Sequence, residues 1–117
     1  MGDRIQWSCQ EDVEKVWIYE GNEYSHRLVT NKRQGCESVS FHITTYEPNF
    51  DVTVVGDGVH EVVLFCLEGD SRQIVEGQPE VHFKPGMAMY QPRNYRFRHI
   101  IGPNGLKVAV SCNPPRE

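Results

Sequence analysis

The order of apolar and polar positions predicts β-strands along most of the chain. Residues 39–46 alternate and are rich in β-branched and aromatic side chains, and residues 51–55 follow before a Gly-Asp-Gly turn. Residues 60–67 form a nearly continuous apolar run, as expected of a central strand covered on both faces. Further short strands are predicted at residues 73–76, 81–84, 88–91, 95–100 and 106–111.

Glycine and proline separate these segments at intervals of roughly ten residues, which is typical of a sandwich or a closed barrel. The sequence therefore predicts an all-β fold. Only the N-terminal part differs, because residues 9–27 could hold a short helix around residues 11–16. At 117 residues the chain is expected to form a single domain.

Charge and cysteine content narrow the range of partners. The net charge of −4 argues against nucleic acid, which prefers a clustered basic surface. The four cysteines lack C-x-x-C spacing, so they predict neither a zinc knuckle nor a thioredoxin-like site. The polar start is unlike a signal peptide, and no apolar stretch approaches membrane-spanning length. We therefore expect a cytoplasmic protein with free thiols and no membrane partner.

The segment from Gly86 to Phe97 has the spacing of a metal-binding hairpin and lacks its ligand. It follows G-x5-P-x-N-x-x-F, whereas the second motif of cupin barrels is G-x5-P-x-G-x-x-H, in which the last residue holds a metal. Asn94 takes the second glycine position, and asparagine tolerates the left-handed conformation of a tight turn. Phe97 occupies the ligand position.

Four short motifs make the resemblance more specific. Ser40-Phe-His-Ile-Thr-Thr45, Cys66-Leu-Glu-Gly69, Lys84-Pro-Gly86 and Cys112-Asn-Pro-Pro115 occur in the order and at about the spacing found in ectoine synthases, which are small cupins. The chain thus resembles that family from residue 23 to residue 117. The resemblance implies a cupin-type jelly-roll barrel at residues 23–117, after a short irregular or helical segment at residues 1–22. It also implies a homodimer and a small-molecule substrate.

Ectoine synthases close a cyclic amidine with loss of water, aided by iron held by a Glu, a Tyr and a His. Aligned on the motifs, these ligand positions hold Val62, Met89 and Phe97, which cannot coordinate a divalent ion. Glu61 and Tyr90 are each one residue away, so strand alternation points them to the opposite face unless a bulge re-aims them. We therefore predict no metal or other cofactor and no ectoine synthesis.

Histidines are the candidate catalytic groups. If Val62 and Phe97 face inward, then His60 and His99 do so too, and we expect them to be cross-strand neighbours roughly 5 Å apart. Tyr95 faces the same way and could donate a hydrogen bond to a ligand, and His42 faces the pair across the cavity. Two alternatives stay open: satisfied core histidines, or a relocated metal site formed by His60, His99 and His42.

The resemblance also implies substrate contacts. By position these are His42 and Thr44 on one strand, Val110 and Cys112 before Asn-Pro-Pro, and Arg27 ahead of the first barrel strand. Met89 and Phe97, with Met87, would form an apolar wall suited to a less polar ligand than a diamino acid.

Two functional hypotheses follow. In the first, the protein is a metal-independent lyase, cyclase or isomerase in which His60 and His99 exchange protons with the substrate. In the second, it is a non-catalytic small-molecule binder that kept the barrel and lost the chemistry.

Overall fold

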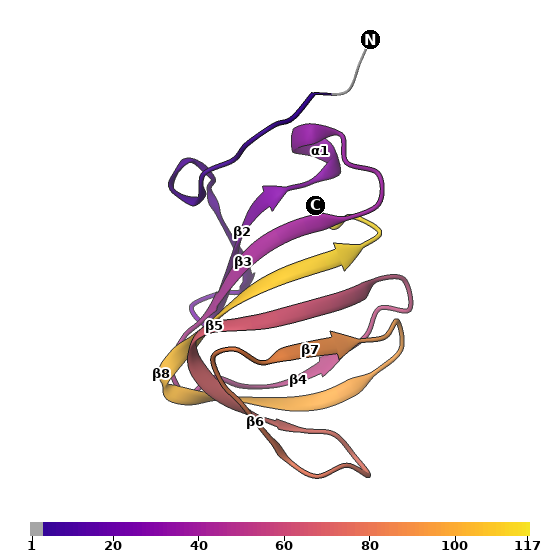
Figure 1. The fold of residues 1–117 in the computed structure, drawn as a ribbon. Helices are drawn as coiled ribbons and strands as arrows, with labels where there is room; N and C mark the ends of the chain where they lie inside the picture. Colours follow the sequence, from indigo (N-terminus) through magenta and orange to yellow (C-terminus); the bar gives the residue numbers. More distant parts are fainter. Residues whose placement is uncertain (1–3) are drawn as a thin grey trace.

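The computed structural model describes residues 4–117 as an antiparallel β-structure with very little helix (Figure 1). The strands are β1 (Lys15–Tyr19), β2 (Glu23–Val29), β3 (Ser40–Tyr46), β4 (Asp51–Val55), β5 (Glu61–Ile74), β6 (Val81–Phe83), β7 (Ala88–Gln91) and β8 (Arg96–Asn113). A 3₁₀ turn, η1 (Gln10–Asp12), precedes β1, and one short helix, α1 (Asn31–Gln34), joins β2 to β3. Within the described residues, no helix is long and apolar enough to span a membrane.

Two long strands, β5 and β8, take part in both layers of the structure. The C-terminal part of β8 lies between β3 and the start of β5, which gives the layer β1-β2-β3-β8-β5-β7. The N-terminal part of β8 lies between β4 and the end of β5, which gives the layer β4-β8-β5-β6. Figure 1 shows these two strands curving from one layer into the other.

Glycines allow the bend at which the two long strands change layers. The register between β5 and β8 shifts between Gly69 and Ser71, and Gly69 has a left-handed backbone with φ of 77°. A Cβ atom at Gly69 would overlap the carbonyl oxygen of Gly105 on β8. Only glycine combines this conformation with so close an approach of two backbones.

The core lies between the layers and follows strand alternation. On β5, Val62, Leu64 and Cys66 are buried, whereas the intervening residues are exposed. Val108 of β8 and Phe83 of β6 pack in the same cluster. Burial of such side chains contributes on the order of 1.5–3 kcal/mol each, and it also fixes the register, because a slip of one residue would expose the whole set.

Several predicted boundaries were wrong. The helix expected around residues 11–16 is a 3₁₀ turn followed by β1, which pairs with β2 and extends the first layer. The segments predicted at 60–67 and 73–76 form one bent strand, and so do those at 95–100 and 106–111. Their Gly-rich interruptions bend a continuous strand because partners on both sides keep the ladder hydrogen bonds.

Candidate functional site

A cavity of about 220 Å³ lies between the two layers at one end of the barrel. We call it the barrel pocket and define it by six of its residues, Glu23, His42, Tyr46, His60, Val62 and Phe97. They come from β2, β3, the start of β5 and β8, so the fold brings together groups far apart in sequence. A mostly apolar cavity with a few polar groups is the usual form of a small-molecule site.

Glu23 is the buried acidic group of this pocket. It is the first residue of β2, is paired with Tyr46 at the end of β3, and is 8% exposed. Burial raises the pKa of Glu23 to about 7, and a hydrogen bond with the Tyr46 hydroxyl offsets part of that rise. The carboxyl group can therefore gain or lose a proton near neutral pH, as a general acid or base must.

His60 lies at the rim and is oriented by Asp57. Its Nδ1 is 2.6 Å from the Asp57 carboxylate, which also accepts the backbone N–H groups of His60 and Val59. These two backbone hydrogen bonds, followed by the one from the imidazole, hold the pKa of Asp57 well below its usual range. Asp57 thus stays ionised and engages Nδ1, which leaves Nε2 as the nitrogen available to a ligand.

His42 faces the same pocket, but its imidazole is more deeply buried than that of His60. It is buried, and its Nε2 lies 3.1 Å from the backbone carbonyl of Arg116. Burial lowers the pKa of His42 to about 4, so the ring is neutral at pH 7 and donates to that carbonyl. The Arg116 amide donates in turn to Ser40 Oγ, and its guanidinium lies 3.4 Å from Asp57. Arg116 therefore closes one edge of the pocket.

His99 lies outside the pocket, so the expected neighbourhood of His60 and His99 was wrong. Residues 61–68 of β5 pair with the C-terminal part of β8 and with β7, whereas His99 pairs with Val52 and Gln73. His99 is 1% exposed, and its Nε2 is 2.8 Å from Ser71 Oγ. Burial lowers its pKa to about 4. The strand bend places the two histidines on different parts of the sheet.

The other residues named from the sequence divide into three groups. Thr44, Tyr95, Phe97, Val110 and Cys112 line the barrel pocket together with His42 and His60. Met89 lines a neighbouring cavity, together with Phe97. Arg27 lines a separate groove with Lys32 and Glu117, and burial lowers its pKa.

Two of the positions that the resemblance aligns with iron ligands, Val62 and Phe97, lie in the barrel pocket. Val62 and Phe97 present hydrocarbon to it, and β5 pairs with β7 from Val62 to Phe65 without a bulge. Tyr90 is exposed, and its hydroxyl donates to Glu61 at 2.5 Å, so neither residue lines the pocket. At the aligned positions, Val62 and Phe97 therefore offer no donor atom to the family's metal.

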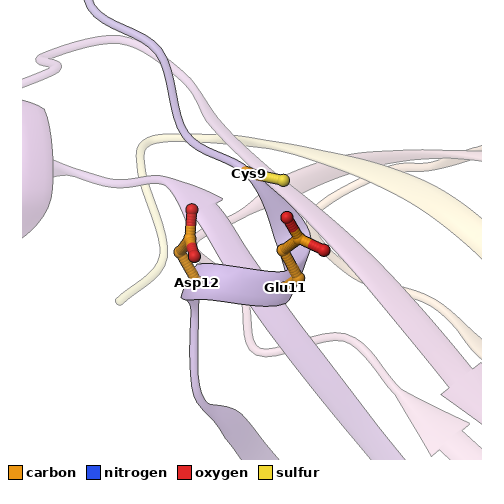
Figure 2. Close-up of side chains that lie close together, drawn as sticks. All are labelled: Cys9, Glu11 and Asp12. Atoms are coloured by element: carbon orange, nitrogen blue, oxygen red, sulfur yellow. The ribbon is translucent and has the colours of Figure 1, made fainter.

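Across residues 4–117, one group of three side chains has ligand atoms close enough to share an ion. It consists of Cys9, Glu11 and Asp12, all exposed on the turn before β1 (Figure 2). This turn lies outside the barrel pocket, and exposed acidic groups commonly occur without a metal.

Sequence reasoning missed six polar residues of the pocket, which are Tyr19, Glu23, Tyr46, Asp57, Gln91 and Arg116. Glu23 was missed because β2 was not predicted as a strand. Gly21 and Asn22 lie between two segments with aromatic and β-branched residues, and they are the signal that could have indicated the β1–β2 hairpin. On that hairpin Glu23 and Ser25 lie on the same, buried face of β2.

The sequence matches no protein-family model and no curated protein. Solved structures do match. Ectoine synthase from P. lautus aligns with a TM-score of 0.81 at 20% identity, covering 96% of this chain and 80% of that chain. The polyketide cyclase RemF from Streptomyces resistomycificus aligns with a TM-score of 0.76 at 19% identity, covering 98% of this chain and 83% of that chain.

A RmlC-like cupin from Shewanella frigidimarina aligns with a TM-score of 0.75 at 18% identity, covering 100% of this chain and 97% of that chain. The chain thus has an ectoine synthase-like cupin fold. This confirms the all-β jelly-roll barrel predicted from the sequence.

Proposed function

We propose that the protein is a metal-independent lyase, cyclase or isomerase that acts on a small metabolite in the barrel pocket. The observation that carries this proposal is the carboxyl group of Glu23, which is buried inside the pocket and hydrogen-bonded to the Tyr46 hydroxyl. A buried carboxyl group in a ligand cavity is costly to maintain, and acid–base catalysis is a common reason for one. His60, oriented by Asp57, supplies a second proton-transfer group.

The two groups suit the elimination of water. In the proposed step, the Glu23 carboxylate takes a proton from a carbon or nitrogen of the substrate. Protonated His60 gives the Nε2 proton to the departing hydroxyl oxygen, so that a double bond forms and water leaves. Glu23 ends the step protonated and His60 neutral, and exchange of one proton between them or with solvent restores both. Positioned acid–base groups contribute typically about 10²–10⁴-fold to a rate.

This proposal replaces the His60–His99 pair with Glu23 and His60. His99 is hydrogen-bonded to Ser71 in the core, and its low pKa favours a neutral ring that does not accept a proton near pH 7. One of the similar structures is named a polyketide cyclase, and the ectoine synthases that the sequence resembles also close a ring. These two likenesses support a ring-closing reaction, and neither identifies a substrate.

The test is proton abstraction and loss of water across a panel of small β-hydroxy ketones, hydroxy acids and acylated diamino acids. Deuterium uptake from D₂O, read by NMR, detects abstraction even where no product accumulates. We expect turnover of at least one compound, and about 10²–10⁴-fold less in Glu23→Gln. Because the ionised form of Glu23 is the base, activity should fall as pH drops below about 7.

The matched control is Asp51→Asn, which alters an exposed carboxylate paired with Arg98 on the outer face of β4. It should leave turnover unchanged. We expect no ectoine from the acetylated diamino acid, even with added iron. Full turnover in Glu23→Gln would refute the proposal. Binding of panel compounds without exchange or water loss would favour the non-catalytic binder instead.

A further inference from the structure

A second cavity, of about 520 Å³, lies beside the barrel pocket between the β6–β7 segment and the start of β8. We call it the side cavity and define it by Gln73, Val81, Phe83, Met87, Met89 and Phe97. Most of these side chains are hydrocarbon or thioether, which pack adaptably against apolar ligands. Phe83 and Met87 also belong to or pack against the main core, so the wall of the cavity is a fixed part of the barrel.

Gln73 is a buried polar residue in this wall. It is 4% exposed, and its Nε2 has no hydrogen-bond partner within the described part of the chain. A buried amide donor left without an acceptor lowers stability by about 1–3 kcal/mol, so proteins rarely keep one without a purpose. A ligand oxygen in the side cavity would satisfy it.

The side cavity shares a wall with the barrel pocket. Gln91, Tyr95 and Phe97 line both. The Gln91 Nε2 group donates to the Met89 sulfur at 3.6 Å, which links a pocket residue to a residue of the side cavity. The two cavities are therefore neighbours, and these three side chains lie where they meet.

We propose that the side cavity binds the apolar part of the substrate, a ring or short hydrocarbon group bearing one oxygen that accepts the Gln73 hydrogen bond. The link to a substrate rests on the proposed function, whereas binding in the cavity does not. The protein thus acts on an amphipathic molecule whose reacting end faces Glu23. This class is less polar than a diamino acid, in keeping with the apolar wall around Met89.

The experiment compares two probes of similar shape, acetophenone, which has a carbonyl acceptor, and cumene, which has none. Binding to the full chain is followed by NMR of the methionine methyl groups, with the signals of Met87 and Met89 assigned by Met→Leu variants. Acetophenone should shift both signals in a saturable way. Cumene should bind about tenfold more weakly, which corresponds to about 1.4 kcal/mol for one neutral hydrogen bond.

Gln73→Leu should abolish the preference for acetophenone. Gln78→Leu, at the exposed rim of the same cavity, should keep it. Equal affinity of the two probes for the unmodified protein, or no shift with either, overturns the proposal without need of any variant. Glu23→Gln should still bind acetophenone, so a failure of the catalytic proposal and a failure of this one give different results.

Discussion

At the residue scale, burial shifts the pKa values of the acid and the histidines inside the barrel in opposite directions. It raises the pKa of Glu23 to about 7, and it lowers those of His42 and His99 to about 4. Asp57 is exposed and held ionised by hydrogen bonds. Glu23 is therefore the buried group whose charge changes near neutral pH. Desolvation raises the pKa of an acid and lowers the pKa of a base, so burial keeps both histidines neutral and lets Glu23 titrate.

The apolar residues at the inherited ligand positions lead to a prediction about metal content. Val62 and Phe97 line the pocket and offer no lone pair to an ion. We expect protein purified without chelator to carry no stoichiometric iron or zinc. Elemental analysis is the measurement. One tightly held metal per chain would contradict the prediction and would favour a relocated histidine site.

His60 and His99 should respond differently to replacement. His60→Ala removes a rim group and should reduce turnover strongly while lowering the melting temperature only slightly. His99→Ala leaves Ser71 without its partner and opens a cavity against Tyr46 and Phe97, so it should cost about 2–4 kcal/mol of stability. Thermal melts read beside turnover check both effects. A His99→Ala protein that is stable but inactive would instead support His60 and His99 as the catalytic pair.

The pH dependence of the free energy of unfolding gives a second test of the burial of His99. Its folded pKa of about 4 lies below the ordinary value of 6.5, so the unfolded chain binds the proton more tightly. The associated stability is complete above about pH 6.5 and is lost as pH falls towards 4. A His99→Phe variant should show a shallower loss in this window. The remaining slope includes a loss from His42, whose pKa is shifted in the same direction, and an opposite contribution from Glu23, whose folded pKa of about 7 lies above its ordinary value of 4.5.

Site residues were predictable where the barrel strand that carries them was predictable. Thr44 and Val110 were implied by the resemblance, on strands with strong β patterns, and both line the pocket. Glu23 was not predictable in that way, because its strand places polar side chains inward, the reverse of the usual pattern. His99 was misplaced for a geometric reason, since alternation gives the face of a strand but not its neighbour.

At the scale of elements, the bend in β5 and β8 depends on backbone approach. Gly69 combines a left-handed φ of 77° with contact against Gly105, whereas Gly77 has φ of 81° and open space where a Cβ would lie. Gly69→Ala should therefore destabilise the protein by at least about 2 kcal/mol more than Gly77→Ala, which carries only the conformational strain. Urea unfolding of both variants measures the difference. Equal losses would mean that the bend adapts easily.

The strands after residue 39 were predicted from periodicity and turn residues, and the structure contains them with shifted ends. What the sequence did not reveal was continuity across the bends. A Gly-rich interruption looks the same whether the chain reverses or bends, and only partners on both sides decide between the two. The β1–β2 hairpin was missed because its polar residues lack a clear period of two.

At the scale of the whole molecule, the outer face of the first layer leaves apolar side chains uncovered. Phe41 of β3 and Val63 and Phe65 of β5 are each 38–45% exposed on this face. The register of β3, β8 and β5 places Phe41 and Val63 on either side of Ser111, so the side chains form one surface. Contiguous apolar surface of this kind usually marks an interface. We propose that a second copy of the chain covers it.

Light scattering should accordingly give the mass of a dimer at micromolar concentration. Phe65→Asp should yield a folded monomer, because a charge on this face opposes burial, whereas Thr53→Asp on the exposed side of β4 should remain dimeric. A monomer of the unmodified chain at working concentration would contradict the homodimer.

The passage of β5 and β8 through both layers has a consequence for how the barrel opens. A sandwich made of separate sheets can lose one sheet while the other persists, but here each layer contains part of the same two strands. Subglobal opening of one layer must therefore release ladder bonds in the other. In native-state hydrogen exchange, the amides at both ends of β5 should become exposed in a single cooperative unit, with protection equal to that of global unfolding.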